Sequence, residues 1–87
     1  MSSTQQNVQW EDLLSEAKAA LRQGNYADAE RRYKAALESA EKQFGKDTSH
    51  FAIILSELGE CFEAQGKESQ AEECFQQVRD ILKVVSQ

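Results

Sequence analysis

The chain has 87 residues, enough for one small domain, and its 40% apolar and 29% charged residues are typical of a globular protein. Its formal net charge is −5, without a basic stripe, so neither a nucleic acid nor an anionic membrane surface is expected as a partner. No apolar run approaches the roughly 20 residues of a membrane span. The N-terminus also lacks the basic and apolar segments of a secretory signal. We therefore expect a cytoplasmic protein.

The composition predicts an all-α fold. Proline is absent and only four glycines occur. Alanine, glutamate, leucine, lysine and glutamine dominate, and these residues are strong helix formers. The most strand-like run, FAIIL at residues 51–55, lies within a longer helical period.

The first two amphipathic segments are separated by a glycine. The first runs from about residue 7 to residue 22, with the apolar stripe Trp10, Leu13, Leu14, Ala17, Ala20 and Leu21. Gly24 follows, and glycine readily adopts the left-handed conformation that ends many helices. The second segment runs from about residue 26 to residue 44, with the stripe Ala29, Tyr33, Ala36, Leu37, Ala40 and Phe44.

The third and fourth segments repeat this arrangement. After a loop in which Asp47, Thr48 or Ser49 can cap a helix, the third segment runs from about residue 49 to residue 65. Its stripe is Phe51, Ile54, Leu55, Leu58, Gly59 and Phe62. Gly66 ends it, and the fourth runs from about residue 68 to residue 85, with the stripe Ala71, Cys74, Phe75, Val78, Ile81, Leu82 and Val85. Short turns make neighbouring helices antiparallel, so we predict two helical hairpins.

The two hairpins repeat each other at a spacing of 42 residues. This shift superimposes GNYADAERRY at residues 24–33 on GKESQAEECF at residues 66–75. An internal repeat of this length is typical of a helical solenoid. Two helices approach to about 8–10 Å where small side chains line their contact, and Ala17, Ala29, Gly59 and Ala71 supply such residues. We interpret the repeated pattern as architectural.

These residues give the chain a resemblance to the tetratricopeptide repeat family over about residues 10–85. The family pattern has a large apolar residue, Leu-Gly or Leu-Ala, and an aromatic on the first helix, then Ala, Phe or Tyr, and a small residue on the second. The first hairpin follows it with Leu13, Ala17, Gly24, Tyr26, Ala29, Tyr33 and Ala36, and the second with Leu55, Leu58, Gly59, Phe62, Gly66, Ala71, Phe75 and Val78. The resemblance implies two antiparallel helix hairpins stacked as a short α-solenoid.

The long repeat step and the loop EKQFGKDTSHFA resemble the kinesin-light-chain type of this repeat. On this interpretation residues 1–6 are a disordered N-terminus and residues 7–87 form one domain. Repeat one then spans 7–44, a loop spans 45–48, and repeat two spans 49–86. The chain departs from the family pattern in lacking a proline near the end of the second helix. It also has Glu68 where repeat one has Tyr26, which predicts a looser second turn.

The sequence offers little for catalysis. No phosphate-binding loop, nucleotide fingerprint or metal-ligand cluster occurs, and His50 has no orienting partner in the sequence. We therefore predict no enzymatic activity, no catalytic residue, no metal site and no cofactor. Cys61 and Cys74 are expected to be packed, free thiols. Trp10 is expected to anchor the first helix, and the alternative is an exposed anchor for a partner.

The resemblance implies a non-enzymatic protein–protein interaction module, an adaptor or scaffold whose first helices line a concave groove for a peptide or helix. Projection onto this face gives the predicted groove residues Glu11, Leu14, Lys18, Leu21, Arg22, Ile53, Ser56, Glu60 and Glu63. Lys18 and Arg22 lie one turn apart and could hold a carboxylate. The Lys/Asn clamp of the chaperone-tail class is not expected, because Leu14 and Glu57 occupy its positions.

The last helix is expected to leave an apolar face uncovered, because repeat proteins bury their cores by stacking and this chain has two repeats. We predict that this face forms a homodimer interface, or receives a partner's helix. The predicted interface residues are Cys74, Val78, Ile81, Leu82 and Val85. The alternative function is therefore a self-assembling structural homo-oligomer with no separate peptide ligand.

Overall fold

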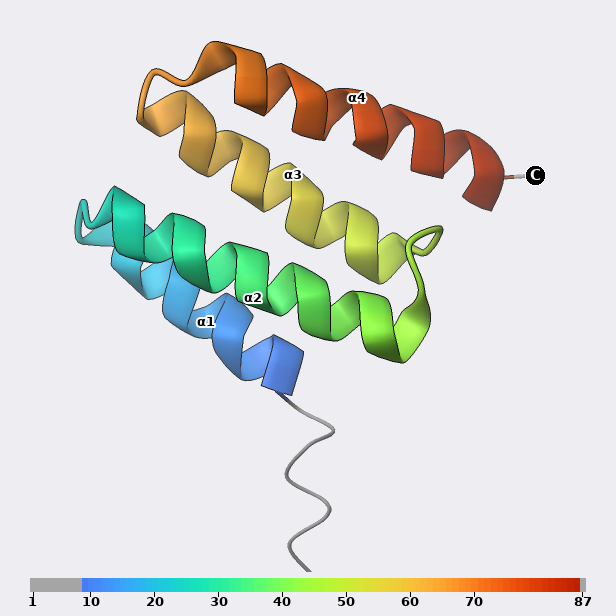
Figure 1. Cartoon of the computed structure of the whole chain (residues 1–87), viewed down its shortest axis with the longest axis horizontal. Coiled ribbons are helices and arrows are strands. Elements are labelled where there is room, and N and C mark those ends of the chain that lie inside the picture. The colour runs from blue at the N-terminus through green and yellow to red at the C-terminus, as the bar shows by residue number, and fades with distance from the viewer. Residues whose placement is uncertain (1–8, 87) are drawn as a thin grey trace, which may run out of the picture.

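The computed structural model describes residues 9–86, which form four α-helices and no strand. The helices are α1 (Gln9–Arg22), α2 (Tyr26–Phe44), α3 (Ser49–Ala64) and α4 (Glu68–Val85). Figure 1 shows them following one another with alternating direction, and the main contacts join α1 to α2, α2 to α3, and α3 to α4. This arrangement confirms the predicted all-α fold of two stacked hairpins.

The predicted helix limits agree closely with those observed. The third helix ends at Ala64, one residue before its predicted end, and the second and fourth have their predicted limits. The predicted start of the first helix at Asn7 and the predicted disordered segment 1–6 lie outside the described residues. Within residues 9–86, no helix is both long enough and apolar enough to cross a membrane.

Both hairpin turns use a glycine with positive φ. Gly24 has φ 83° and Gly66 has φ 80°. At the first turn, the N–H of Gly24 donates to the Leu21 carbonyl at 3.0 Å, and the N–H of Asn25 donates to the Ala20 carbonyl at 2.9 Å. This pair of bonds is the Schellman motif, which satisfies the last carbonyls of a helix. The equivalent residues of the second turn form both bonds at 2.9 Å.

The two turns thus have equivalent backbone hydrogen bonds. The expectation that Glu68 makes the second turn pack less tightly concerns side chains and stays a prediction, since Tyr26 in repeat one exposes 38% of its surface and buries the rest. The backbone hydrogen bonds and the glycine define the turn in both repeats.

The loop between the hairpins ends at a helix cap. Of the three candidate capping residues, Thr48 performs this role, since its Oγ1 accepts a hydrogen bond from the Phe51 N–H at 3.3 Å. The same hydroxyl donates to the Gly45 carbonyl at 3.1 Å. Thr48 therefore fixes both the start of α3 and the path of the loop before it.

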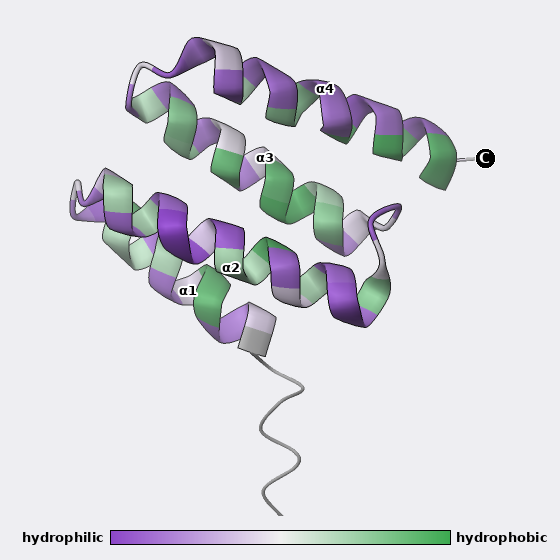
Figure 2. Cartoon of the chain, in the orientation of Figure 1, coloured by the Kyte–Doolittle hydropathy of each residue, from purple (hydrophilic) through white to green (hydrophobic). Residues whose placement is uncertain are grey.

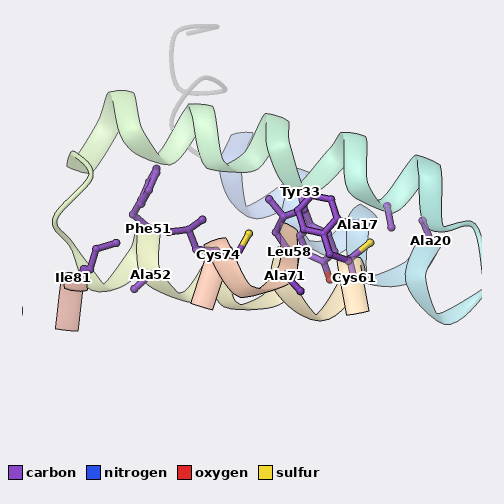
Figure 3. Packing of buried hydrophobic residues seen from close by; sticks show 13 residues of the cluster. Ala17, Ala20, Tyr33, Phe51, Ala52, Leu58, Cys61, Ala71, Cys74 and Ile81 are labelled. Carbon is purple, nitrogen blue, oxygen red and sulfur yellow. The ribbon is translucent and has the colours of Figure 1, made fainter. Parts of the chain in front are cut away.

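The core combines alanines with large apolar side chains. Ala17, Ala29, Ala36 and Ala40 are completely buried, and Tyr33 is 1% exposed. Figure 3 shows Tyr33 within the same cluster as Ala17, Leu58, Cys61 and Ala71, which come from all four helices. Small side chains at the contacts allow close helix approach, and the Tyr33 ring fills the space beside them.

The contact between α3 and α4 depends on Gly59. A Cβ added to this glycine would lie 2.7 Å from Cε1 of Phe75. The absence of a side chain at Gly59 therefore makes room for the Phe75 ring, which is half-buried.

Three aromatic rings pack together at the ends of the helices that lie opposite the two hairpin turns. Trp10 meets Phe44 edge to face with centroids 5.7 Å apart, and the exposed His50 ring stacks on Phe44 at 3.9 Å. Trp10 also packs against the core cluster of Ala36, Ala40 and Ile54. These contacts are consistent with the expectation that Trp10 anchors the first helix.

Glu30 links the two hairpins. Its Oε2 lies 2.9 Å from the Lys34 Nζ, and its Oε1 accepts hydrogen bonds from Gln65 at 3.1 Å and Lys67 at 3.3 Å. The hydrogen bond from Lys34 and then that from Gln65 lower the Glu30 pKa from 4.5 to about 2. Glu30 on α2 is thus held by residues at the end of α3 and in the following turn.

Replacing Gly66 by valine should destabilise the fold by about 1 kcal/mol or more, because a β-branched residue resists positive φ. Nothing lies within 4 Å of a Cβ added at Gly24 or Gly66, so the cost comes from the backbone alone. Gly66→Asn is the matched control, since asparagine tolerates this conformation better. Urea denaturation measures both, and a valine variant as stable as the wild type would contradict the prediction.

Gly59→Ala should lower stability by about 1 kcal/mol. Alanine gains about 1 kcal/mol in helix propensity, but the clash with Phe75 costs about 1–3 kcal/mol of overpacking. In the double variant Gly59→Ala/Phe75→Leu the clash is removed, so Gly59→Ala should stabilise the Phe75→Leu background. A double-mutant cycle measures this change of sign, and the same effect of Gly59→Ala in both backgrounds would refute the packing argument.

Glu30→Gln should destabilise the protein by about 1–2 kcal/mol at pH 7. A shift from 4.5 to about 2 corresponds to at most about 3 kcal/mol, and solvent screening of the exposed lysines reduces it. Because the folded-state pKa is depressed, this stabilisation is present above pH 4.5 and is lost as the pH falls toward 2. The stability difference between wild type and variant should therefore shrink over that window, whereas the exposed control Glu38→Gln should show little difference throughout.

Candidate peptide-binding groove

A groove of about 450 Å³ opens between α1 and α3. The α1 wall consists of Lys18, Leu21 and Arg22. The α3 wall consists of Ile53, Ser56, Glu57 and Glu60, and Tyr33 of α2 lies between the walls. The groove exists because α1 and α3 both flank α2, whose alanine-rich face leaves Tyr33 as the large side chain at this point.

Six of the nine predicted groove residues line this groove, namely Lys18, Leu21, Arg22, Ile53, Ser56 and Glu60. The other three lie elsewhere. Leu14 is half-buried and packs against the core. Glu63 lines a separate pocket with Phe75. Glu11 is exposed in the first turn of α1, away from the groove residues of that helix.

The sequence prediction did not include Tyr33 and Glu57 in the groove. The prediction gives Tyr33 a role in the core alone, whereas this residue belongs to the core cluster and also lines the groove. Glu57 lies one turn after Ile53 and shares its helix face. The spacing of Ile53, Glu57 and Glu60 is the signal that could have identified Glu57.

Glu57 is the most constrained charge in the groove. Its Oε2 lies 3.6 Å from the Lys18 Nζ, across the groove. Its Oε1 is buried and has no hydrogen-bond partner among residues 9–86. Burial, followed by the nearby negative charge of Glu57, raises the pKa of Tyr33 above its usual range, so the phenol remains neutral.

The two walls carry opposite charges around an apolar strip. Lys18 and Arg22 make the α1 wall basic, and Glu57 and Glu60 make the α3 wall acidic. Neither Arg22 nor Glu60 forms an ion pair with another described residue. Between the walls, Ile53 exposes 53% of its surface. The groove therefore offers an apolar contact, a free cation and a free carboxylate.

The two cysteines lie in the core. Cys61 and Cys74 are free and buried, in agreement with the prediction, and burial raises the pKa of both. The Cys61 Sγ donates to the Tyr26 carbonyl at 3.7 Å. In residues 9–86, no group of three or more His, Cys, Asp and Glu side chains is arranged to hold a metal ion.

The predicted interface residues of α4 divide into two groups. Cys74 and Ile81 are buried and belong to the core, so they are not available to a second molecule. Val78 is partly buried, whereas Leu82 and Val85 are 48% and 43% exposed. The wide apolar stripe of α4 thus has one edge toward the core and another toward solvent.

A family profile matches most of the chain. The tetratricopeptide repeat profile matches residues 13–83, a range that includes most of both hairpins. No curated protein and no solved structure matches the chain. The resemblance to the kinesin-light-chain type stays a prediction. The observed hairpins and the extent of the profile match together show that the chain belongs to the tetratricopeptide repeat family.

Proposed function

We propose that this protein is an adaptor whose α1–α3 groove binds a peptide or short helix of a partner protein. The family match supports a protein-interaction module in general, and repeats of this family are generally not enzymes. The observation that carries the finer proposal is the groove itself, with exposed Ile53 between a basic and an acidic wall. A cytoplasmic location, and the expectation that neither nucleic acid nor membrane is a partner, remain predictions.

The α1 wall supports binding of a carboxylate. Lys18 and Arg22 lie one helical turn apart, and Arg22 has no ion-pair partner among the described residues. The Lys18–Glu57 contact at 3.6 Å is long and partly exposed, so a ligand that breaks it loses little free energy. An acidic side chain or a C-terminal carboxylate can therefore receive charge-assisted hydrogen bonds here.

The α3 wall supports a donor on the same ligand. The exposed carboxylate of Glu60 lines this wall and forms no ion pair with another described residue. A backbone or side-chain N–H of the ligand would donate a charge-assisted hydrogen bond to it. An apolar ligand residue on Ile53 and Leu21 would then separate this donor from the carboxylate.

Replacing both Lys18 and Arg22 by alanine should weaken peptide binding about tenfold or more at low salt, since each charge-assisted contact contributes about 1.5–3 kcal/mol before screening. A random peptide library displayed on phage supplies the ligand, and fluorescence polarisation measures its affinity. The same peptide with its acidic group amidated should bind the wild type as weakly as the parent peptide binds the variant.

Lys42→Ala is the matched control, because Lys42 is an exposed cation of α2 that does not line the groove. It should leave affinity unchanged. If the library yields no ligand, or if a selected peptide binds the double variant with wild-type affinity, the groove proposal fails.

The alternative function, self-assembly without a peptide ligand, is supported by a different surface. Leu82, Val84 and Val85 are exposed on the last helix, away from the groove residues.

A further inference from the structure

We propose that α4 forms an antiparallel, two-fold interface with α4 of a second copy, in which Glu72 of each copy pairs with Lys83 of the other. This interface uses no residue of the α1–α3 groove, and it is independent of peptide binding.

The internal repeat identifies the outer face of α4 as a helix-docking face. The second helix of repeat one, α2, is covered by α3 of repeat two. Tyr33 is therefore buried, and Glu30 accepts hydrogen bonds from Gln65 and Lys67. The residues of repeat two that are equivalent to Tyr33 and Glu30, 42 positions later, are Phe75 and Glu72. No helix of the described chain covers this second surface.

A pocket lies on α4 at the place that corresponds to the α3-covered face of α2. It measures about 400 Å³ and is lined by Glu63, Glu68, Ala71, Glu72 and Phe75. Further along α4, Leu82 is 48% exposed, whereas its equivalent in repeat one, Ala40, is completely buried. Figure 2 shows that the N-terminal part of α4 is mostly polar and that its C-terminal end is apolar.

The first helix of a second copy does not suit this surface. In a head-to-tail stack, α1 would take the place of α3, and Asp12 and Glu16 would stand where α3 has Ile54 and Leu58. Both carboxylates are exposed in α1, and Glu16 already pairs with Arg32 at 2.6 Å. Burying them against Phe75 and Leu82 would be costly without new partners. Head-to-tail growth is therefore disfavoured.

The α4 helix of a second copy does suit the surface. Its N-terminal half carries Glu68, Glu72 and Glu73, and its C-terminal half carries Arg79 and Lys83 with one acidic residue, Asp80, so that half is net basic. The separation of 11 residues from Glu72 to Lys83 is close to three helical turns, so both lie on the same edge of α4. An antiparallel pair places the acidic half of each helix beside the basic half of the other.

The same register brings apolar side chains together. With Glu72 opposite Lys83 of the second copy, Phe75 lies near Leu82 of that copy, and the two-fold axis repeats the contact. The neighbours α2 and α3 are also antiparallel, so the second copy adopts the direction that the fold already uses. The intramolecular contact between Arg79 and Glu72, at 3.2 Å, joins two exposed side chains that can rearrange.

The test begins with sedimentation equilibrium of the wild-type chain and of the single charge reversals Glu72→Lys and Lys83→Glu. Each reversal turns two attractive contacts of the dimer into two repulsive ones, so the dimer Kd should rise about tenfold at low salt. Glu73→Lys is the control, because Glu73 is exposed on a different edge of the same helix and its reversal should leave the Kd unchanged.

Mixing the two single variants tests the antiparallel pairing directly. A mixed dimer of Glu72→Lys with Lys83→Glu restores opposite charges at both symmetry-related contacts, so the variants should associate with each other more tightly than either does with itself. The double variant Glu72→Lys/Lys83→Glu should likewise recover the wild-type Kd.

Leu82→Glu tests the apolar contact, and circular dichroism verifies that the helices remain. This exposed position is preferable to the buried Ile81, whose replacement would disturb the core. We expect the Leu82 variant to be folded and monomeric. A wild-type chain that stays monomeric at millimolar concentration would overturn the proposal. So would a dimer that Leu82→Glu leaves intact, or charge variants that fail to associate on mixing.

Discussion

Close approach between helices is the constraint on which the rest of the structure depends. It requires residues without bulk at the contacts, and Ala17 and Ala29 meet this requirement with no exposed surface. Tyr33 can then occupy the space that the alanines leave, at the junction where α1, α2 and α3 meet. The same ring forms part of the groove. The core packing of α2 therefore determines how far apart the two walls of the candidate binding site stand.

Much of the fold could be predicted because its determinants are local. Helical period and glycine position fix the helices and turns within a few residues, and both turns show the expected positive φ. The errors concern which helix covers which side chain. A projection of one helix shows an apolar stripe but not the limits of its neighbour, so Leu14 was placed in the groove and Ile81 at a surface. A single-helix projection identifies six of the residues that line the groove, and all six lie on α1 or α3.

Glu30 and Glu72 show why equivalent sequence positions need not have equivalent chemistry. Both follow a buried alanine at the start of a second helix. Glu30 has α3 and the following turn beside it, and its hydrogen bonds lower its pKa to about 2. Glu72 lies beside an open pocket, and its ion-pair partner among the described residues is the exposed Arg79. The difference comes from the next helix along the stack, which the repeat pattern alone does not supply.

The two ends of the stack differ in polarity, and this difference controls how copies could combine. The outer face of α1 carries Asp12 and Glu16, while that of α4 carries Phe75 and Leu82. A head-to-tail contact would leave the α4 face of one copy uncovered, so further copies could add to it. A two-fold contact between α4 helices covers the α4 faces of both copies, so the assembly stops at two. Because the groove is lined by residues of α1, α2 and α3 alone, such a dimer would keep two free grooves. A partner with two suitable motifs would then bind its second motif at a high effective concentration, without any additional contact within either groove.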